Sequence, residues 1–411
     1  MVDTHSMSAG LQALAPGSKP VCMVVDPWDL PYNGTVVSSR RFVEGMCKLG
    51  LNFRILSCQL GKGEDLVDEG AGPGISCHGS GRLERYYFPA LSLPGVNGII
   101  RSMKVMLGRP DKQLMAQALS GAGLLHVQFP FFLGYSAIAM ARKMQLPVIC
   151  SFHVQPENLL LNLGLNFKWL RELLYKIFIR YIYNRADLVI APSRFAADQL
   201  IKRNLQRPVE VVSNGVPDKF FIPKATPNDS ADVADFHILS VGRLSGEKQQ
   251  SLLIDAIANS RHREKIQLQL VGAGPNEVEL NTQITKAGIN ATVETVSDAE
   301  LLLRYQLADL FVHCGMIELE GMSVAEAMAA SNAVVVSDSE ASAAGMFAIS
   351  ESAKFKSGDV NDLTEKLDYW IENPDARIEA GKLNRNFIQG YRHEACIEKL
   401  IGLYARFSGE G

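Results

Sequence analysis

The segment around Glu318 carries residue types that can bind a phosphorylated, hydroxylated ligand. Glu318 and Glu326 are eight positions apart, and Gly321 between them precedes an apolar stretch of helical character. A helix beginning there would leave the amides of Gly321, Met322 and Ser323 free to face a phosphate, with added attraction from the helix dipole. Glu326, one turn further, suits a ribose diol. The alternative is that these carboxylates only offset the helix dipole or face solvent.

Two cations follow an apolar run at 236–241. Gly242 comes directly after the run, and Arg243 and Lys248 are five positions apart. Preplaced cations stabilise the negative charge that a departing diphosphate gains in a transition state. The pair therefore suits leaving-group stabilisation, and the competing interpretation is two ordinary surface cations.

Two more positions in the first half of the chain suit a ligand site. Gly34, directly after Asn33, permits close approach of the backbone to a ligand. An Asn-Gly pair also forms a plain turn, which is an equally good interpretation. His153 follows the apolar run 147–150, where a strand-end side chain can reach a ligand, although a lone histidine is more often structural.

The elements that would hold these residues are short apolar runs that alternate with helix-length segments. This alternation predicts an α/β protein with two parallel sheets, each covered by helices on both faces. Ligands of such folds bind at the carboxyl ends of the strands, so we expect the chemistry in a cleft between two Rossmann-like domains. The predicted strands are 21–25, 53–56, 124–127, 147–150, 188–191, 236–241, 266–271, 310–313 and 333–336.

The length and a polar, proline-bearing stretch at 223–232 indicate where the domains divide. A chain of 411 residues exceeds one typical core and suits two domains. We expect a flexible tail at 1–20, an N-terminal acceptor-side domain at 21–216 and a C-terminal domain at 217–390. A helix is expected at 391–411, long enough to cross back to the first domain.

Composition excludes several classes of function. With 41 Lys and Arg against 44 Asp and Glu, the formal net charge is −3, so no basic field calls for a nucleic acid. Seven scattered cysteines lack the paired spacing of a structural zinc site and suit a reducing cytosol. Residues 1–20 do not resemble a signal peptide, and no segment reads as a membrane span. We therefore expect a cytoplasmic protein without metal or cofactor.

Taken in order, these segments resemble the family-4 retaining glycosyltransferases, and the resemblance covers nearly the whole chain from about residue 21. Glu320 departs from the family pattern, in which an aromatic residue stands at this place, and 329–334 lacks the usual glycine and proline. The landmarks are Asn33-Gly34, 151–153, 191–193, 213–216, Gly242-Arg243 with Lys248, 271–274, and Glu318 with Glu326 at the family's spacing.

The resemblance implies a GT-B fold and metal-independent transfer of a sugar from a nucleotide-diphosphate donor, with retention of anomeric configuration. Arg243 and Lys248 would contact the diphosphate. His153 and Glu318 would position the donor sugar, and Glu326 would bind the ribose. The other donor-binding positions that it implies are Asn33, Gly34, Gly242, Gly272, Gly321, Met322 and Ser323.

The sequence gives weaker indications of which donor and which acceptor are used. Uridine is the expected base because many relatives use UDP-sugars. Residues 26–38 and 87–94 are similar to the branch with diacylglycerol glycosyltransferases and related mannosyltransferases, which points to glycolipid or polysaccharide synthesis with a lipid-linked or saccharide acceptor. The basic, aromatic segment 167–183 is able to lie on an anionic membrane at its inner face. Alternatively, it is an amphipathic helix packed against the first domain.

Other functions remain open for such a sequence. A sugar-nucleotide epimerase or a phosphorylase can share the double-domain plan, and a non-catalytic nucleotide-sugar-binding protein can retain the fold. The charged residues described above argue against lost catalysis. A dinucleotide dehydrogenase is disfavoured because no G-x-G-x-x-G follows the first strand.

Overall fold

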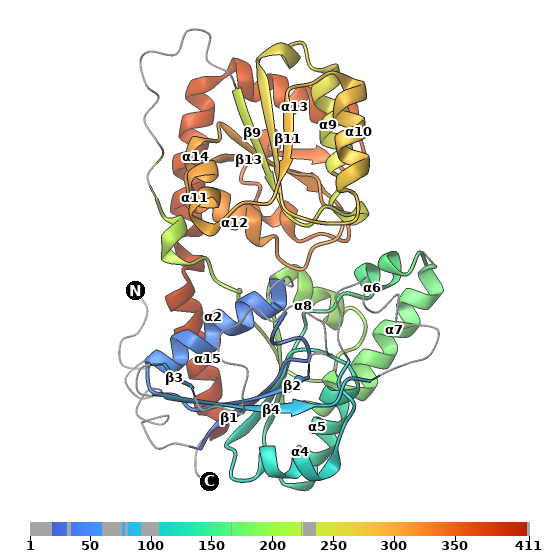
Figure 1. Ribbon diagram of the computed structural model, residues 1–411, viewed down its shortest axis with the longest axis vertical. Helices are drawn as coiled ribbons and strands as arrows, with labels where there is room; N and C mark the ends of the chain where they lie inside the picture. Colours follow the sequence, from blue (N-terminus) through green and yellow to red (C-terminus); the bar gives the residue numbers. More distant parts are fainter. Residues whose placement is uncertain are drawn as a thin grey trace. The chain divides into compact units, whose positions relative to one another are not determined.

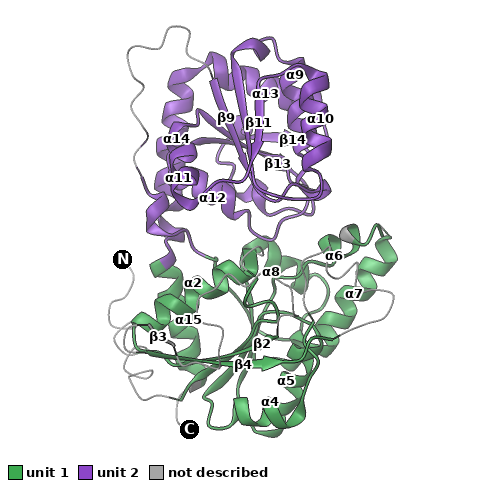
Figure 2. Cartoon of the chain, viewed as in Figure 1, with its two compact units in different colours: residues 1–214, 394–411 green, residues 215–393 purple. Residues whose placement is uncertain are grey.

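The computed structural model describes residues 19–30, 34–59, 76–78, 81–91, 107–165, 167–222, 224 and 236–408. The predictions for the first 18 residues of the tail, for Asn33 and for most of the stretch 223–232 lie outside these described residues. The chain divides into two compact units, 1–214 with 394–411 and 215–393, shown in Figure 2. We refer to them as unit 1 and unit 2.

Unit 1 is built on an eight-stranded sheet in the order β3-β4-β2-β1-β5-β6-β7-β8. Its neighbouring strands are parallel except for the antiparallel edge pair β3 and β4. The first strand, β1, lies between β2 and β5, so the strand order reverses next to β1, as at the switch point of a doubly wound sheet. The strands are β1 (Val21–Val24), β2 (Phe53–Cys58), β3 (Ser76–His78), β4 (Gly81–Phe88), β5 (Leu124–Val127), β6 (Val148–Ser151), β7 (Leu188–Ala191) and β8 (Val209–Val211).

Helices cover both faces of this sheet (Figure 1). They include the C-terminal helix α15, whose Leu400, Leu403 and Tyr404 belong to the same buried cluster as Met23 and Val43. The last helix of the chain is therefore part of the core of unit 1. The helices are α2 (Gly34–Lys48), α4 (Lys112–Leu119), α5 (Phe132–Lys143), α6 (Pro156–Asn162), α7 (Lys168–Tyr181), α8 (Arg194–Ile201) and α15 (His393–Ser408).

Unit 2 has a six-stranded sheet in the order β11-β10-β9-β12-β13-β14, with all neighbouring strands parallel. This is the doubly wound order, and its switch point lies between β9 and β12, where ligands of such sheets bind. The prediction of two Rossmann-like parallel-sheet units is confirmed. The strands are β9 (Phe236–Val241), β10 (Ile266–Val271), β11 (Ala291–Glu294), β12 (Leu310–His313), β13 (Ala333–Asp338) and β14 (Lys354–Lys356).

The core of unit 2 forms two layers because successive residues of a strand point to opposite faces of a sheet. Ile238 of β9 belongs to one buried cluster, and its neighbour Leu239 belongs to the other. Near-continuous apolar strands of this kind are typical of sheets covered on both sides. The covering helices are α9 (Gln250–Asn259), α10 (Glu277–Ala287), α11 (Asp298–Leu307), α12 (Met322–Ala329), α13 (Val360–Glu372) and α14 (Pro374–Ile388) (Figure 1).

Candidate functional site

The first part of the candidate site is the loop between β9 and α9 of unit 2. Gly242 and Arg243 follow the strand directly, and Lys248 ends a single 3-10 turn, Gly246–Lys248. The carbonyl of Arg243 accepts a hydrogen bond from Nε2 of Gln250 at 2.8 Å, which fixes the loop backbone. Among the described residues, no acidic side chain pairs with the guanidinium of Arg243. This cation is therefore available to an anionic ligand.

Glycines at the end of β10 bring a second backbone against this loop. Gly272 has a φ of 149°, and a side chain there would collide with the carbonyl oxygen of Gly242. A side chain at Gly274 would meet the carbonyl of Leu244 in the same way. The amide of Gly242 donates to the carbonyl of Val271 at 3.0 Å. The two loops pack backbone to backbone, which only glycine allows at these positions.

The loop after β12 brings a carboxylate to the switch point. Nζ of Lys248 donates a hydrogen bond to Oε1 of Glu318, so an ion pair joins the loops after β9 and β12. His313, the last residue of β12, has its Nε2 atom 3.2 Å from the same oxygen. Burial alone would raise the pKa of Glu318, but Lys248 and His313 outweigh that effect and hold the pKa at about 2. The carboxylate is therefore ionised at neutral pH.

The backbone around Glu318 is held by the segment that follows β13. The amide of Glu318 donates to the carbonyl of Ala341 at 3.2 Å, and its carbonyl accepts from the amide of Ala343 at 2.8 Å. The hydroxyl of Ser339 donates to the carbonyl of Met316 at 2.7 Å. The position of this carboxylate is thus set by two neighbouring strands of the sheet.

Helix α12 begins four residues after Glu318, at Met322. Gly321 lies before it in a left-handed conformation, with a φ of 91°, and no side chain caps this end of the helix. The first amides of a helix lack partners within it, so those of Met322 and Ser323 can bind an anion. One turn on, Oε2 of Glu326 accepts a hydrogen bond from the hydroxyl of Tyr305 at 3.2 Å. Burial raises the pKa of Tyr305 well above its usual value, which keeps that hydroxyl protonated.

Most of the predicted site residues thus lie in unit 2, at or just after the carboxyl ends of the strands of its sheet. Lys248 and Glu318 are in direct contact. Gly272 shapes the loop that carries Gly242, and Glu326 lies on the helix that follows the Glu318 loop. This arrangement offers two cations, helix amides and two carboxylates, which together suit a diphosphate that carries hydroxylated groups.

Within the described part of unit 1, the predicted site residues are His153 and Gly34. His153 follows β6 by two positions and is partly buried. Burial lowers its pKa to about 4, so its imidazole is neutral at pH 7. Gly34 is the first residue of α2, and a side chain there would have no neighbour within 4 Å.

A buried hydrogen-bond network supports the strand that leads to His153. Nδ1 of His126 lies 2.6 Å from the hydroxyl oxygen of Tyr404, and its Nε2 lies 2.7 Å from the hydroxyl oxygen of Ser151. Burial lowers the pKa of His126 to about 3, so the ring stays neutral. Because Ser151 ends β6, this network joins α15, β5 and β6 just before His153.

His313 and Tyr305 contact the two carboxylates of the candidate site but were not predicted from the sequence. His313 is the last residue of a predicted strand and precedes the Glu318 loop, so its place at a carboxyl strand end was a usable signal. Tyr305 lies in α11, and nothing in the sequence indicates that its hydroxyl meets Glu326, which is 21 positions away.

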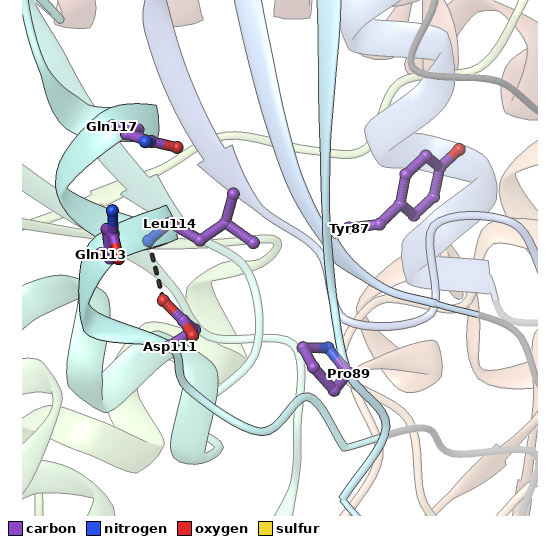
Figure 3. A pocket seen from close by; sticks show the side chains of 6 residues that line it. All are labelled: Tyr87, Pro89, Asp111, Gln113, Leu114 and Gln117. Carbon is purple, nitrogen blue, oxygen red and sulfur yellow. Dashed lines mark hydrogen bonds between the residues drawn. The ribbon is translucent and has the colours of Figure 1, made fainter.

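A crevice of about 380 Å³ lies in unit 1 between the end of β4 and the first turns of α4 (Figure 3). Asp111 accepts a hydrogen bond from the amide of Leu114 at 2.8 Å, which caps α4. The ring of Tyr87 points away from this helix in Figure 3. No predicted site residue lines the crevice, whose lining residues are Tyr87, Pro89, Asp111, Gln113, Leu114 and Gln117.

Two further features concern metals and membranes. Within the residues that the structure describes, no group of three or more His, Cys, Asp and Glu side chains is placed to hold a metal ion. No helix in the described part of the chain is both long and apolar enough to cross a bilayer.

Comparison with protein families gives matches to both halves of the chain. Residues 32–220 match the family described as Glycosyltransferase Family 4, and residues 221–392 match the family described as Glycosyl transferases group 1. The boundary between these two matches lies close to the boundary between the two compact units.

Similar proteins include two transferases. The alpha-monoglucosyldiacylglycerol synthase of Streptococcus pneumoniae is 25% identical over 225 residues, a match that spans 52% of this chain and only 51% of that protein. The GDP-mannose-dependent alpha-mannosyltransferase of Mycolicibacterium smegmatis is 25% identical over 333 residues, 77% of this chain and 79% of that protein.

Solved structures share the overall fold at low sequence identity. Sucrose-phosphate synthase from Thermosynechococcus elongatus has a TM-score of 0.71 at 18% identity, covering 94% of this chain and 98% of that one. Anabaena HepE in complex with UDP has a TM-score of 0.68 at 16% identity, covering 93% of this chain and 98% of that one.

Proposed function

The chain belongs to the family-4 glycosyltransferases of the GT-B fold, and from this premise we propose that it is a retaining, metal-independent hexosyltransferase. It takes its sugar from a nucleoside-diphosphate donor and passes it to a lipid-linked or saccharide acceptor. One observation carries the proposal. The ion pair of Lys248 and Glu318 lies at the switch point of unit 2, and Lys248 shares its loop with Arg243, whose guanidinium has no acidic partner among the described residues.

The two cations are assigned to the donor diphosphate. Cleavage of the bond between the anomeric carbon and the phosphate leaves new negative charge on the diphosphate, and fixed cations stabilise that charge. Arg243 and Lys248 supply the positive charge that a bound metal ion supplies in other enzymes. The first amides of α12 add further donors to the phosphates.

The two carboxylates are assigned to hydroxyl groups of the donor. Glu318 is ionised and tied to Lys248, so it can accept hydrogen bonds from the sugar while its charge stays balanced. Glu326 has one oxygen on the hydroxyl of Tyr305 and is half-buried, which suits it to accept from the ribose. Neutral His153 contributes a further hydrogen bond that positions the sugar.

Retention follows when both events occur on one face of the sugar. The bond from the anomeric carbon to the phosphate oxygen breaks, the acceptor oxygen bonds to the same carbon from the same side, and the acceptor proton passes to the departing phosphate. This route needs no enzyme nucleophile, and we assign none. The departing phosphate of the donor acts as the base that accepts the proton of the acceptor.

UDP-hexose is the proposed donor because the family resemblance favours uridine. GDP-mannose is the second candidate, since the match to a GDP-mannose-dependent transferase runs over 77% of this chain. A lipid-linked acceptor is supported by the similarity to a monoglucosyldiacylglycerol synthase. The enzyme would then work in the cytoplasm at the inner face of a membrane, as a peripheral protein.

The test measures nucleoside-diphosphate release from a panel of UDP- and GDP-sugars, in the presence of EDTA, with and without a membrane lipid extract. We expect release from one donor that depends on the extract and is lost in Arg243→Ala and Glu326→Ala. Arg263→Ala is the matched control, because this exposed residue precedes β10, at the amino ends of the strands and away from the candidate site.

Three outcomes would contradict parts of the proposal. Release that persists in both site variants would remove the site assignment. Activity that needs an added divalent cation would remove metal independence. Conversion of a nucleotide sugar to its epimer without any acceptor would replace transfer by epimerisation.

A further inference from the structure

Helix α7 of unit 1 has an exposed face on which apolar and cationic side chains alternate. Four apolar residues recur every fourth position, and their exposed fractions are 66% for Trp169, 43% for Leu173, 39% for Ile177 and 47% for Tyr181. Residues at this spacing lie on one side of a helix, here within an arc of about 120°. We define the α7 face as Trp169, Leu173, Lys176, Ile177, Arg180 and Tyr181.

The opposite side of the same helix already anchors it to unit 1. Tyr175, Phe178 and Ile179 are buried. The ring of Tyr175 packs against that of Phe152 at 6.2 Å, and the guanidinium of Arg203 lies 3.8 Å from its centre. The α7 face is thus not needed to hold the helix in place, and its apolar surface has no partner among the described residues that buries it.

The charge of the α7 face has one sign. No described acidic residue pairs with Lys176 or Arg180, and Arg180 stacks beside Tyr181 at 5.7 Å. The one acidic residue of the helix, Glu172, is held away by a two-pronged bond to Arg203, with both N–O distances 2.9 Å. The face therefore presents uncompensated positive charge beside apolar side chains.

We propose that the α7 face docks on the surface of an anionic lipid bilayer, with the helix lying in the membrane plane. Trp169 and Tyr181 are 12 positions apart, so aromatic rings mark both ends of a face about 18 Å long, and aromatic rings favour the boundary between headgroups and acyl chains. Leu173 and Ile177 would enter the acyl boundary between them, while Lys176 and Arg180 extend to anionic headgroups.

Residues just before α7 add further exposed apolar side chains and one more cation to this surface. Leu163 and Phe167 have exposed fractions of 39% and 53%, and Lys168 adds another exposed cation. A second copy of the chain fits the face less well, because a two-fold pairing would place like charges opposite each other. The surface chemistry therefore favours acidic lipid over self-association.

This docking deepens the proposed function, on which it rests for its purpose, because a lipid-linked acceptor must be reached at a membrane surface. The test uses the full chain and flotation with vesicles of phosphatidylcholine alone or with phosphatidylglycerol. We expect binding to the anionic vesicles that weakens as salt is raised. Lys176→Glu with Arg180→Glu, and separately Trp169→Ser with Ile177→Ser, should each lower the bound fraction by about tenfold or more.

The matched controls are Lys382→Glu and Ile378→Ser on α14, both exposed, which should bind as the parent does. Circular dichroism and thermal unfolding would show that each variant is folded. Equal binding of parent and α7 variants would overturn the proposal, as would equal binding to neutral vesicles. A dimer that forms through this face without vesicle binding would identify a second copy as the occupant and would also overturn it.

Failure of docking and failure of the enzymatic proposal give different results. Donor turnover with a detergent-dispersed acceptor, combined with no vesicle binding, would refute docking and leave the transferase proposal intact. Vesicle binding through α7 without turnover of any donor would support docking and refute the transferase proposal. If both proposals are right, the charge-reversed variant keeps its activity in detergent and loses it on vesicles.

Discussion

Nε2 of His313 lies 3.2 Å from Oε1 of Glu318, the same carboxylate oxygen to which Lys248 is bound. One oxygen is thus shared by a cation from the loop after β9 and an imidazole from the end of β12. The absence of a side chain at Gly315 leaves room for that ring, because a Cβ there would stand 2.5 Å from the imidazole. The arrangement fixes both the ionisation and the direction of the carboxylate.

Replacement of Glu318 by glutamine should reveal this ionisation in the stability of the protein. The native pKa of about 2 lies below the ordinary 4.5, so the unfolded chain takes up the proton first as pH falls. The stabilisation is therefore complete above pH 4.5 and is lost as pH falls toward 2. We expect the variant to be less stable by about 2–3 kcal/mol at pH 7, with a deficit that shrinks below pH 4.5.

Urea unfolding over this pH range would measure the effect. Glu264→Gln is the control, because Glu264 pairs with Arg263 at the surface with its side chain 85% exposed. A deficit for Glu318→Gln that does not change with pH would indicate that lost packing, and not lost charge, causes it.

His313 should act on the donor by positioning Glu318. His313→Ala is expected to raise KM for the donor sugar by about tenfold, with a smaller change in kcat, while His313→Gln keeps a donor group and restores part of the loss. Steady-state kinetics of both variants would test this. A loss of stability without any change in KM would assign His313 to folding alone.

The contribution of Asp26 to stability should change with pH in the opposite direction to that of Glu318. Asp26 follows β1, accepts a hydrogen bond from the amide of Gly108 at 3.1 Å, and burial raises its pKa to about 7. Between pH 4 and 7 the unfolded chain loses this proton while the native protein keeps it, so stability falls as pH rises through that window. Asp26→Asn removes the titration and should gain stability relative to the parent, by a few kcal/mol at pH 7.

Chemical unfolding at pH 4 and at pH 7 would show whether the advantage of Asp26→Asn grows with pH. Asp111→Asn is a useful comparison, since Asp111 is an exposed helix cap in the same unit. An advantage of equal size at both pH values would contradict a protonated Asp26 in the native protein.

Gly272→Ala should destabilise the site by forcing the loops apart. A Cβ at this position would collide with the carbonyl of Gly242, and its φ of 149° disfavours a side chain in any case. We expect a loss of about 2 kcal/mol or more, together with weaker donor binding. Gly246→Ala in the neighbouring loop is the control, because a Cβ there has no atom within 4 Å. Thermal unfolding that ranks the two variants equally would refute the close approach.

The inner strands could be predicted from the sequence because both faces of the sheets are covered. Every residue of β1, β5 and β7 is buried; β1 and β7 read as unbroken apolar runs, and β5 is interrupted only by His126. Strands at or next to the edges of the sheets lack this signal. Strand β4 runs Gly-Arg-Leu-Glu-Arg-Tyr-Tyr-Phe with four half-buried positions, and β11 is nowhere fully buried. Both were missed because half-exposed strands carry mixed side chains.

Helix boundaries near the C-terminus were also only partly predictable. Helix α13 is capped by Asp359, whose carboxylate accepts from the amides of Asn361 and Asp362. The break between α14 and α15 falls at a 3-10 turn, Gln389–Tyr391, close to the expected helix start at 391, and Gly390, directly after the C-cap residue of α14, is a common helix-ending signal. Candidate site residues that are adjacent in the chain, such as Gly242 and Arg243, could be placed together from the sequence. The contact between Tyr305 and Glu326 depends on how α11 packs against α12, which no local pattern specifies.

The two cations of the site should behave differently when each is removed, and this contrast separates a ligand-binding role from a structural one. Lys248 balances the largely buried carboxylate of Glu318, so Lys248→Ala should cost about 1–3 kcal/mol of stability. Arg243 has no ion-pair partner among the described residues, so Arg243→Ala should leave the unfolding midpoint nearly unchanged. Both variants should weaken binding of the nucleoside diphosphate by about tenfold to a hundredfold, because charge-assisted bonds to phosphate are lost. Calorimetric titration with UDP and GDP, beside thermal unfolding, would measure both quantities. Arg243→Ala with unchanged affinity for both nucleotides would show that the guanidinium serves some other ligand. Lost affinity with intact stability would identify Arg243 as a diphosphate-binding residue.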